Sequence, residues 1–343
     1  MKKIDARAFR AASQARRVAS AYYLSNPRVT LIDVGWRIKE SEGGRSTDEL
    51  AVRVHVNQKP REAVLESLAL TSPQLFIDKN KIPFDLVDIV ESPYHLEWQW
   101  FLPQPPPRGN VFDPLQGGIS ISNEWFFNYG TLGGLVQDRE TGDKMILSNW
   151  HVLVGSAYAP KGLKIYQPGR GDGGGIQGTI ATYERDAMLQ GVDAAVAKLN
   201  NVRQWVNDQV DLGPVSGVSA PALGMQVVKS GRGSNVTYGV IDGVEGEYPI
   251  RYGGLLRKIK YVQRIVPQND GQQASVGGDS GSWWLEQSTN RAVALHFAGY
   301  DEPETALAIA MPQVLDALNI DIMTTVQADV TGAVVTPVEL VRV

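Results

Sequence analysis

Cysteine is absent from the 343 residues of this chain. That absence excludes disulfide frameworks, cysteine nucleophiles and thiolate metal sites together. Because secreted proteins often carry disulfides, it also favours a reducing compartment. The histidines and acidic residues form no group with the spacing of metal ligands, so we expect no metal site.

Long apolar runs and a charge excess of one sign are also missing. No stretch approaches the ~20 continuous apolar residues of a membrane span, and the first twenty residues lack the apolar core of a signal peptide. We therefore expect a cytoplasmic protein with no membrane partner. Charged residues make up 20% of the chain, the net charge is -4, and Lys and Arg are scattered. Nucleic acid is not an expected partner.

The first hundred residues predict a small α/β domain. Apolar and small residues recur at helical spacing through residues 6–24, with Ala8, Ala12, Ala15, Ala19 and Tyr22 on one face. Two Val- and Ile-rich runs, at 29–38 and 49–58, predict a hairpin around a Gly-Gly turn. A short helix near 61–70 and a third strand at 82–91 complete the predicted domain, residues 1–100.

A proline cluster, FLPQPPPRGN, then predicts an extended linker over residues 101–116. Short β-type runs between Gly-rich turns follow and predict an all-β barrel or sandwich over 117–323. The run MPQVLDALNI predicts a closing helix. The last segment, 324–343, is β-prone but interrupted by Gly and Pro, and is expected to be an edge strand or an arm.

The sharpest motif is Gly-Gly-Asp-Ser-Gly-Ser at 277–282. A nucleophilic serine requires a tight turn in which glycines let backbone amides point into one small space, where an oxyanion develops in the transition state. The amides of Gly278 and Ser280 are the candidates for such an oxyanion hole. Taken alone, the string also fits an ordinary polar turn.

A serine nucleophile needs a base on another segment, and the chain has four histidines. His55 lies in the predicted first domain and His95 beside the linker, so both are badly placed. His151 closes the apolar run MILSNWHVLV, where a strand end is expected to meet a loop. A half-buried structural histidine is the competing interpretation.

An aspartate should orient that base. Asp193 opens the run Asp-Ala-Ala-Val-Ala-Lys-Leu, and the start of a buried strand would desolvate its carboxylate. Asp186, in the polar TYERDAM, is the rival. The chain order His151, Asp193, Ser280 is that of the chymotrypsin arrangement and differs from those of subtilisins and α/β-hydrolases. Three concordant segments outweigh one motif.

Around these residues the chain resembles chymotrypsin-fold serine peptidases, through Ser-Asn-Trp-His-Val, Asp-Ala-Ala-Val-Ala and Gly-Gly-Asp-Ser-Gly-Ser. Gly-Thr-Leu-Gly at 130–133, Ser-Gly-Arg at 230–232 and Leu-His-Phe-Ala-Gly at 295–299 are similar to the trypsin-like branch that includes bacterial homologues of the narrow-leaf plant peptidases. The resemblance spans about residues 117–320. It implies a mainly β protein with a chymotrypsin-like double six-stranded β-barrel after a small α/β domain, and endopeptidase activity through an acyl-enzyme, without metal or organic cofactor.

One departure from that family concerns activation. Secreted members are cut to free an Ile or Val amine that pairs with the Asp before the nucleophile, here Asp279. This chain has Gly118-Ile119 after a long folded domain, and Gln116-Gly117 in place of a basic cleavage site. We therefore expect Asp279 to have another partner, and oligomerisation, a partner protein or the N-terminal domain to order the oxyanion loop.

The resemblance also implies the substrate pocket. Ala274 stands at its base, so a preference for Arg or Lys is disfavoured. Ser275 and His296 match the positions at which glutamyl endopeptidases hold a substrate carboxylate, and Phe297, Ala298 and Gly299 form a wall. An acidic preference is one hypothesis and a preference for small or apolar residues is the other, with His296 then a packed strand histidine.

Other interpretations remain open. The glycine-rich string 169–175 lacks the features of a phosphate-binding loop and is expected to be a surface loop. Trp283 and Trp284 are expected to be core residues. The chain is also compatible with a latent or inactive pseudoprotease that acts as an oligomeric binding scaffold, with a chaperone-like homo-oligomer, or with an esterase-like acyl transferase. We expect a protein or peptide substrate, a homo-oligomer and a regulatory partner protein.

Overall fold

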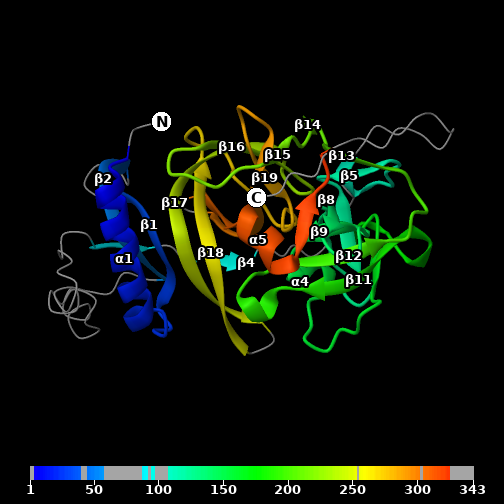
Figure 1. The fold of residues 1–343 in the computed structure, drawn as a ribbon, viewed down its shortest axis with the longest axis horizontal. Coiled ribbons are helices and arrows are strands. Elements are labelled where there is room, and N and C mark those ends of the chain that lie inside the picture. The colour runs from blue at the N-terminus through cyan, green and yellow to red at the C-terminus, as the bar shows by residue number, and fades with distance from the viewer. Residues whose placement is uncertain are drawn as a thin grey trace. The chain divides into compact units, whose positions relative to one another are not determined.

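The computed structural model describes residues 4–39, 45–57, 87–91, 94–96, 107–252, 255–301 and 304–324. The chain forms two compact units (Figure 1). Unit 1 comprises Met1–His95, Ala222–Met225 and Ile241–Arg264, and unit 2 comprises Leu96–Pro221, Gln226–Val240 and Ile265–Val343. None of the described helices has both the length and the apolar character needed to cross a bilayer.

Unit 1 opens with the predicted helix, α1 (Ala6–Tyr23), whose first turn is capped by Asp5. Its buried face carries Ala12, Ala15, Ala19 and Tyr23 at helical spacing. The predicted face is thus confirmed in its centre and wrong at its ends, because Ala8 and Tyr22 are exposed.

The predicted hairpin is confirmed as β1 (Val29–Lys39) and β2 (Arg45–Val56), which pair antiparallel, and β3 (Val87–Glu91) adds a parallel strand. One face of these strands packs against α1, since alternate residues of a strand share a face. That apolar core contains Ala15, Ala19, Tyr23, Leu24, Val29, Ile32, Val52, Val54 and Val56. The helix predicted near 61–70 lies outside the described residues.

Two long strands, β17 (Asn235–Tyr252) and β18 (Leu255–Pro267), contribute to both units. The part of β17 in unit 1 pairs antiparallel with β1, for example Ile32 with Glu247. The sequence division near residue 100 did not include this later hairpin in the N-terminal region. The unit is therefore completed by residues that follow the first domain by more than a hundred positions.

The first barrel of unit 2 closes through one bent strand. Its strands are paired in the order β8-β9-β12-β11-β10-β6-β7. β7 leads directly into β8 through Leu132, whose amide donates to the Ile119 carbonyl, so the ring of six strands closes. The bounds are β6 (Ser120–Asn123), β7 (Gly130–Thr131), β8 (Gly134–Asp138), β9 (Lys144–Ser148), β10 (Lys164–Tyr166), β11 (Thr179–Asp186) and β12 (Ala195–Leu199).

The second barrel also closes on itself. Its order is β16-β19-β20-β21-β18-β17, and β17 pairs with β16 to complete the six-stranded ring. The predicted mainly β, double-barrel fold after a small α/β region is thus confirmed. The remaining bounds are β16 (Gln226–Gly231), β19 (Trp283–Glu286), β20 (Arg291–Asp301) and β21 (Glu304–Ala310).

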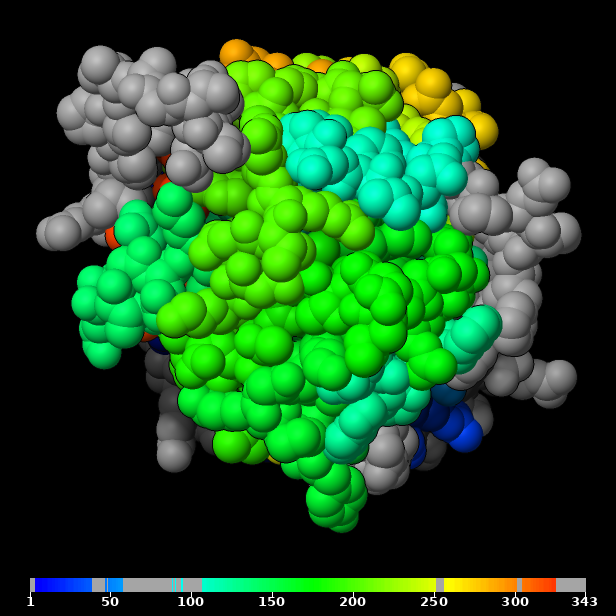
Figure 2. All heavy atoms as spheres, turned by 90° about the vertical axis from the view of Figure 1, so that its right-hand side faces the viewer, coloured from blue at the N-terminus to red at the C-terminus, as the bar shows by residue number. Residues whose placement is uncertain are grey.

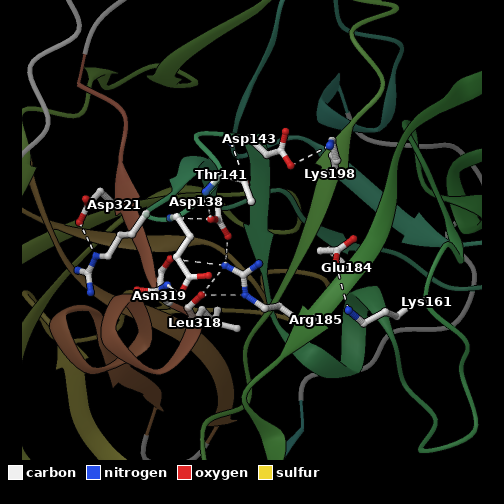
Figure 3. Close-up of polar contacts among 12 residues, drawn as sticks. Asp138, Thr141, Asp143, Lys161, Glu184, Arg185, Lys198, Leu318, Asn319 and Asp321 are labelled. Atoms are coloured by element: carbon white, nitrogen blue, oxygen red, sulfur yellow. Dashed lines mark hydrogen bonds and ion pairs between the residues drawn. The ribbon is translucent and has the colours of Figure 1, made fainter.

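Shorter elements connect and flank the barrels. The predicted closing helix is α5 (Met311–Leu318), and β22 (Ile320–Ile322) then pairs with β8. Arg185 of β11 fixes the end of α5, because its guanidinium donates to the Leu318 carbonyl and pairs with Asp138 (Figure 3). The others are β4 (His95–Leu96), β5 (Leu115–Gly117), α4 (Trp150–Leu153), β13 (Trp205–Gln209), β14 (Gly213–Pro214) and β15 (Gly217–Val218).

The linker and tail predictions fall partly outside the described residues. Within the predicted linker, residues 107–116 are described and include the 3-10 turn Pro107–Gly109 and the start of β5. In the predicted tail, only Thr324 is described.

Figure 2 shows a face on which first-barrel segments, coloured cyan to green, predominate.

Candidate active site

His151 and Asp193 form a buried pair on the first barrel. His151 Nδ1 lies 2.7 Å from Asp193 Oδ2, and the His151 backbone amide donates to Asp193 Oδ1 at 3.2 Å. The side chains are 3% and 0% exposed. A carboxylate that accepts from Nδ1–H leaves Nε2 as the acceptor nitrogen of a neutral imidazole.

The register of the first barrel produces this pair. β12 pairs antiparallel with β9 so that Ala195 lies opposite Ser148. Asp193 precedes that position by two residues and His151 follows it by three, so the two side chains come from neighbouring strand ends. The side-chain amide of Asn149 donates to the Asp193 carbonyl at 2.8 Å and fixes the crossing. His151 lies in α4, a one-turn helix after the predicted strand end.

Ser280 lies in the turn that precedes β19 and is 2% exposed. Its backbone carbonyl accepts from the Thr131 amide at 2.8 Å. Thr131 also accepts at its own carbonyl from Ser148 Oγ at 2.7 Å. β7 therefore connects the strand that leads to His151 with the turn that carries Ser280. Ser280 Oγ makes a long hydrogen bond, 3.5 Å, to the Phe297 carbonyl.

The turn presents two backbone amides that are available to a ligand. Gly278 has a φ of 100°, a conformation that favours glycine. Within the described part of the chain, neither Gly278 N nor Ser280 N donates a hydrogen bond to a protein acceptor, whereas Gly281 N donates to the His296 carbonyl at 2.9 Å. Two unsatisfied N–H groups in one tight turn suit an oxyanion.

Asp279, the residue before Ser280, is a fully buried anion with Lys229 of β16 as its ion-pair partner, 2.6 Å away. It also accepts from the amides of Gly233, Ser234 and Val276. Burial alone raises the pKa of Asp279, but the Lys229 ammonium, His296 and the Ser234 hydroxyl outweigh it and lower the pKa to about 2. The sequence predicted that Asp279 pairs with a group other than a cleaved N-terminal amine. In the structure that group is the side-chain ammonium of Lys229.

The predicted pocket residues are brought to the neighbourhood of this turn. Ala274 and Ser275 donate their backbone amides to Glu304 Oε1 at 3.0 and 3.2 Å. The His296 ring packs edge-on against Trp284, with ring centroids 6.3 Å apart. All six predicted pocket residues are buried: Ala274, Ser275, His296, Phe297, Ala298 and Gly299.

The rival residues lie elsewhere. Asp186 accepts from the Tyr183 hydroxyl at 2.5 Å and from the Met188 amide, so its carboxylate stabilises the turn in which it lies. His55 belongs to unit 1, where it contacts Asp33. His95 lies in β4, and the indole rings of Trp283 and Trp284 are fully buried.

Sequence reasoning missed Lys229, Thr131 and Glu304. Lys229 directly precedes the Ser-Gly-Arg string that carried part of the resemblance, and a lysine inside an apolar strand is the one signal that pointed to it. The side chains of Thr131 and Glu304 contact backbone groups of residues distant in the sequence, and such pairs follow no sequence pattern.

Two closed six-stranded barrels, with His151 and Asp193 on the first and Ser280 beside the second, define a chymotrypsin-like architecture. No family model matches the chain, and no curated protein sequence does. Several solved structures resemble it, among them the following three. Protease A of Thermobifida fusca has a TM-score of 0.46 and 15% identity, over 62% of this chain and 100% of that one.

The Nocardiopsis protease NAPase has a TM-score of 0.45 and 16% identity, over 60% of this chain and 98% of its own. The chymotrypsin of Cellulomonas bogoriensis has a TM-score of 0.44 and 16% identity, over 62% and 100%.

Proposed function

We propose that this protein is a serine endopeptidase that cleaves peptide bonds through an acyl-enzyme. The observation that carries the proposal is the buried 2.7 Å contact between His151 Nδ1 and Asp193 Oδ2. Thr131 links the strand that leads to His151 with the turn that carries Ser280. A buried carboxylate that fixes the tautomer of a histidine is the arrangement a general base requires.

In the first step Ser280 Oγ attacks the carbonyl carbon of the peptide. The proton of the hydroxyl moves to His151 Nε2, and the carbonyl electron pair moves onto oxygen. The amides of Gly278 and Ser280 receive that oxyanion, and Asp193 stabilises the imidazolium. The C–N bond then breaks, and the departing amine takes the proton from Nε2.

In the second step water hydrolyses the ester of Ser280. His151 Nε2 takes a proton from water as its oxygen attacks the acyl carbon, and the same amides receive the second oxyanion. The proton then returns to Ser280 Oγ as the acid product leaves. Apart from the substrate and water, both steps use only groups of this chain.

A fluorophosphonate probe tests the proposal, because it phosphonylates only an activated serine. The wild type should be labelled at Ser280, Ser280→Ala should show no labelling, and His151→Ala should lose labelling by at least ~1000-fold, the scale on which triad members act. Labelling that persists in Ser280→Ala would refute the assignment. Correct folding of both variants is checked by thermal unfolding.

Absence of labelling in the wild type would instead support the pseudoprotease scaffold. The cytoplasmic location, the homo-oligomer and the regulatory partner remain predictions from the sequence, as does the kinship with the narrow-leaf plant peptidases.

The pocket supports a preference for small or apolar residues over acidic ones. The Glu304 carboxylate lies at hydrogen-bond distance from the amides of Ala274 and Ser275, at the predicted base of the pocket. A second carboxylate, from a substrate, would face like charge there. A peptide library should show small residues before the cut, and Glu304→Gln should raise cleavage after Glu several-fold. Strong Glu preference in the wild type would reverse the assignment and return Ser275 and His296 to the acid-binding role.

A further inference from the structure

Arg232 is a buried cation that the proposed mechanism does not use. Its side chain is 0% exposed, and that of its partner Asp172 is 1% exposed. Arg232 Nε donates to Asp172 Oδ2 at 2.9 Å, and Nη2 donates to Oδ1 of the same carboxylate. A buried ion pair is weak evidence of stabilisation by itself. Its geometry must therefore supply the reason for its presence.

The guanidinium stacks on Tyr129, with Cζ 3.4 Å from the ring centroid. Among the described residues, Arg232 Nη1 and Tyr129 Oη have no hydrogen-bond partner. The guanidinium is thus held by the Asp172 carboxylate on one side and by the face of the Tyr129 ring on the other.

This stack rests on Gly278. A Cβ placed on Gly278 would lie 2.8 and 3.0 Å from Cε2 and Cδ2 of Tyr129, and 3.5 Å from Cδ of Arg232. The Arg232 amide donates to Thr131 Oγ1 at 3.0 Å, and that hydroxyl donates to the Gly278 carbonyl at 2.8 Å. The Gly278 peptide is therefore restrained at its α-carbon and at its carbonyl.

The glycine-rich string 169–175 supplies the carboxylate. It is anchored because the Gly171 amide donates to the Asn128 carbonyl at 2.9 Å, and the Arg170 amide donates to Ser122 Oγ at 2.8 Å. The string was expected to be only a surface loop. Its central residue, Asp172, is instead buried and paired with Arg232.

We infer that Asp172, Arg232 and Tyr129 are positioning residues that hold the Gly278 amide at the oxyanion position. The inference rests on the proposed function. It predicts a loss in the step that develops charge on the carbonyl oxygen, with little change in ground-state binding. Misplacement of a catalytic group by about 1 Å costs on the order of 100-fold.

The decisive variant is Tyr129→Leu, which removes the ring face but no charge. Hydrolysis of p-nitrophenyl butyrate is measured per site titrated with fluorophosphonate, together with inhibition by phenylboronic acid, whose tetrahedral adduct places an oxygen in the hole. We expect kcat to fall by ~10–100-fold, KM to stay within about twofold, and boronate affinity to fall with kcat. Tyr129→Phe, which keeps the ring, should restore most of the rate.

The neutral double variant Asp172→Asn/Arg232→Met carries the same test if Tyr129→Leu does not fold. The control is Arg185→Met, which removes the arginine–aspartate pair of the first barrel (Figure 3). It should lower stability and leave kcat per titrated site unchanged. If Tyr129→Leu titrates fully and keeps the wild-type kcat and boronate affinity, the positioning role is wrong while the peptidase proposal stands. If the wild type is not labelled at Ser280, the peptidase proposal itself fails.

Discussion

The two units each bury a cluster of charges, but they connect it to different parts of the chain. In unit 1, Asp33, Arg53, Asp242 and Arg264 come from four strands, and their contacts with one another join side chain to side chain. Arg53 Nη1 also makes a long hydrogen bond, 3.5 Å, to the backbone carbonyl of Trp36. In unit 2, Asp279 accepts from three backbone amides as well as from Lys229. The first cluster fixes strands to one another, and the second fixes the backbone of a loop.

The unit 1 cluster is balanced in charge. Arg53 donates through Nε and Nη2 to Asp33 and through Nη1 to Asp242, and Arg264 pairs with Asp242. Arg264 Nε also donates to the Tyr94 hydroxyl at 2.9 Å. Two arginines and two aspartates leave no net charge, so the neutral form of a neighbouring histidine is the one that fits.

Glycines make room for both clusters. Gly243 of β17 faces the unit 1 pair, and any Cβ there would overlap the carboxylate of Asp33 and the guanidinium of Arg53. A Cβ on Gly231 would likewise overlap the carboxylate of Asp279, but there the neighbouring Gly233 also donates its amide to the same carboxylate. In unit 1, a glycine leaves space between the strands for the charged side chains. In unit 2, glycines leave space for the Asp279 carboxylate, and that carboxylate also binds a backbone amide and so restrains the backbone around it.

Between the two clusters, the largest expected effect follows from Lys229→Met. It leaves Asp279 buried without its cation, which costs about 3–5 kcal/mol of stability. It also releases the loop that positions the Gly278 and Ser280 amides, so the labelling rate of Ser280 per folded molecule should fall on the order of 100-fold. Stopped-flow labelling measures the rate and urea unfolding measures the stability. Lys229→Arg, which keeps the charge, is the matched control and should lose far less of both.

Arg53→Met is the corresponding change in unit 1. It leaves Asp33 and Asp242 without their shared cation, and the same cost of about 3–5 kcal/mol is expected. Because the cluster carries no loop, kcat per titrated site should not change. A loss of kcat comparable to that of Lys229→Met would show that the two clusters do not differ in the way described.

Acid should weaken the Asp279 cluster measurably. The pKa of Asp279 is lowered to about 2 from an ordinary 3.8. A carboxyl group whose pKa is lower in the folded state stabilises the protein at every pH above its pKa in the unfolded state. This contribution, on the order of 2 kcal/mol, is lost as pH falls from about 4 to 2. The free energy of unfolding of the wild type, measured with urea at a series of pH values, should fall across that window. The same curve for Asp279→Asn should fall less over that window, because only the other carboxylates with lowered pKa values, such as Asp33 and Asp138, still contribute.

How much of this was accessible from the sequence differs between strand and loop. The α1 helix, the β1–β2 hairpin and the barrel strands follow from local periodicity, which acts within a few residues. His151, Asp193 and Ser280 were predicted as one site because each lies in a distinctive short motif. The 2.7 Å pairing of the first two required the register of β9 and β12.

The residues that support the site were not predictable in the same way. Lys229 and Asp279 are 50 positions apart, and Arg232 and Asp172 are 60 apart. No periodic pattern connects residues at such separations, so only the closed barrels bring them together. The inclusion of Ile241–Arg264 in unit 1 was missed for the same reason, since β17 and β18 have the pattern of ordinary barrel strands.

The smallest expected effect concerns His55. Burial lowers the pKa of His55 below its ordinary 6.5, Asp33 opposes that change, and Arg53 and Arg264 add to it. A histidine whose pKa is lower in the folded state stabilises the protein at every pH above its pKa in the unfolded state. That contribution is lost as pH falls through and below about 6.5. Hydrogen exchange of the β2 amides should therefore accelerate between about pH 7 and 5, after correction for intrinsic rates. His55→Gln should abolish that acceleration and leave the acid window of Asp279 unchanged, whereas equal acceleration in both proteins would place the sensitive group elsewhere.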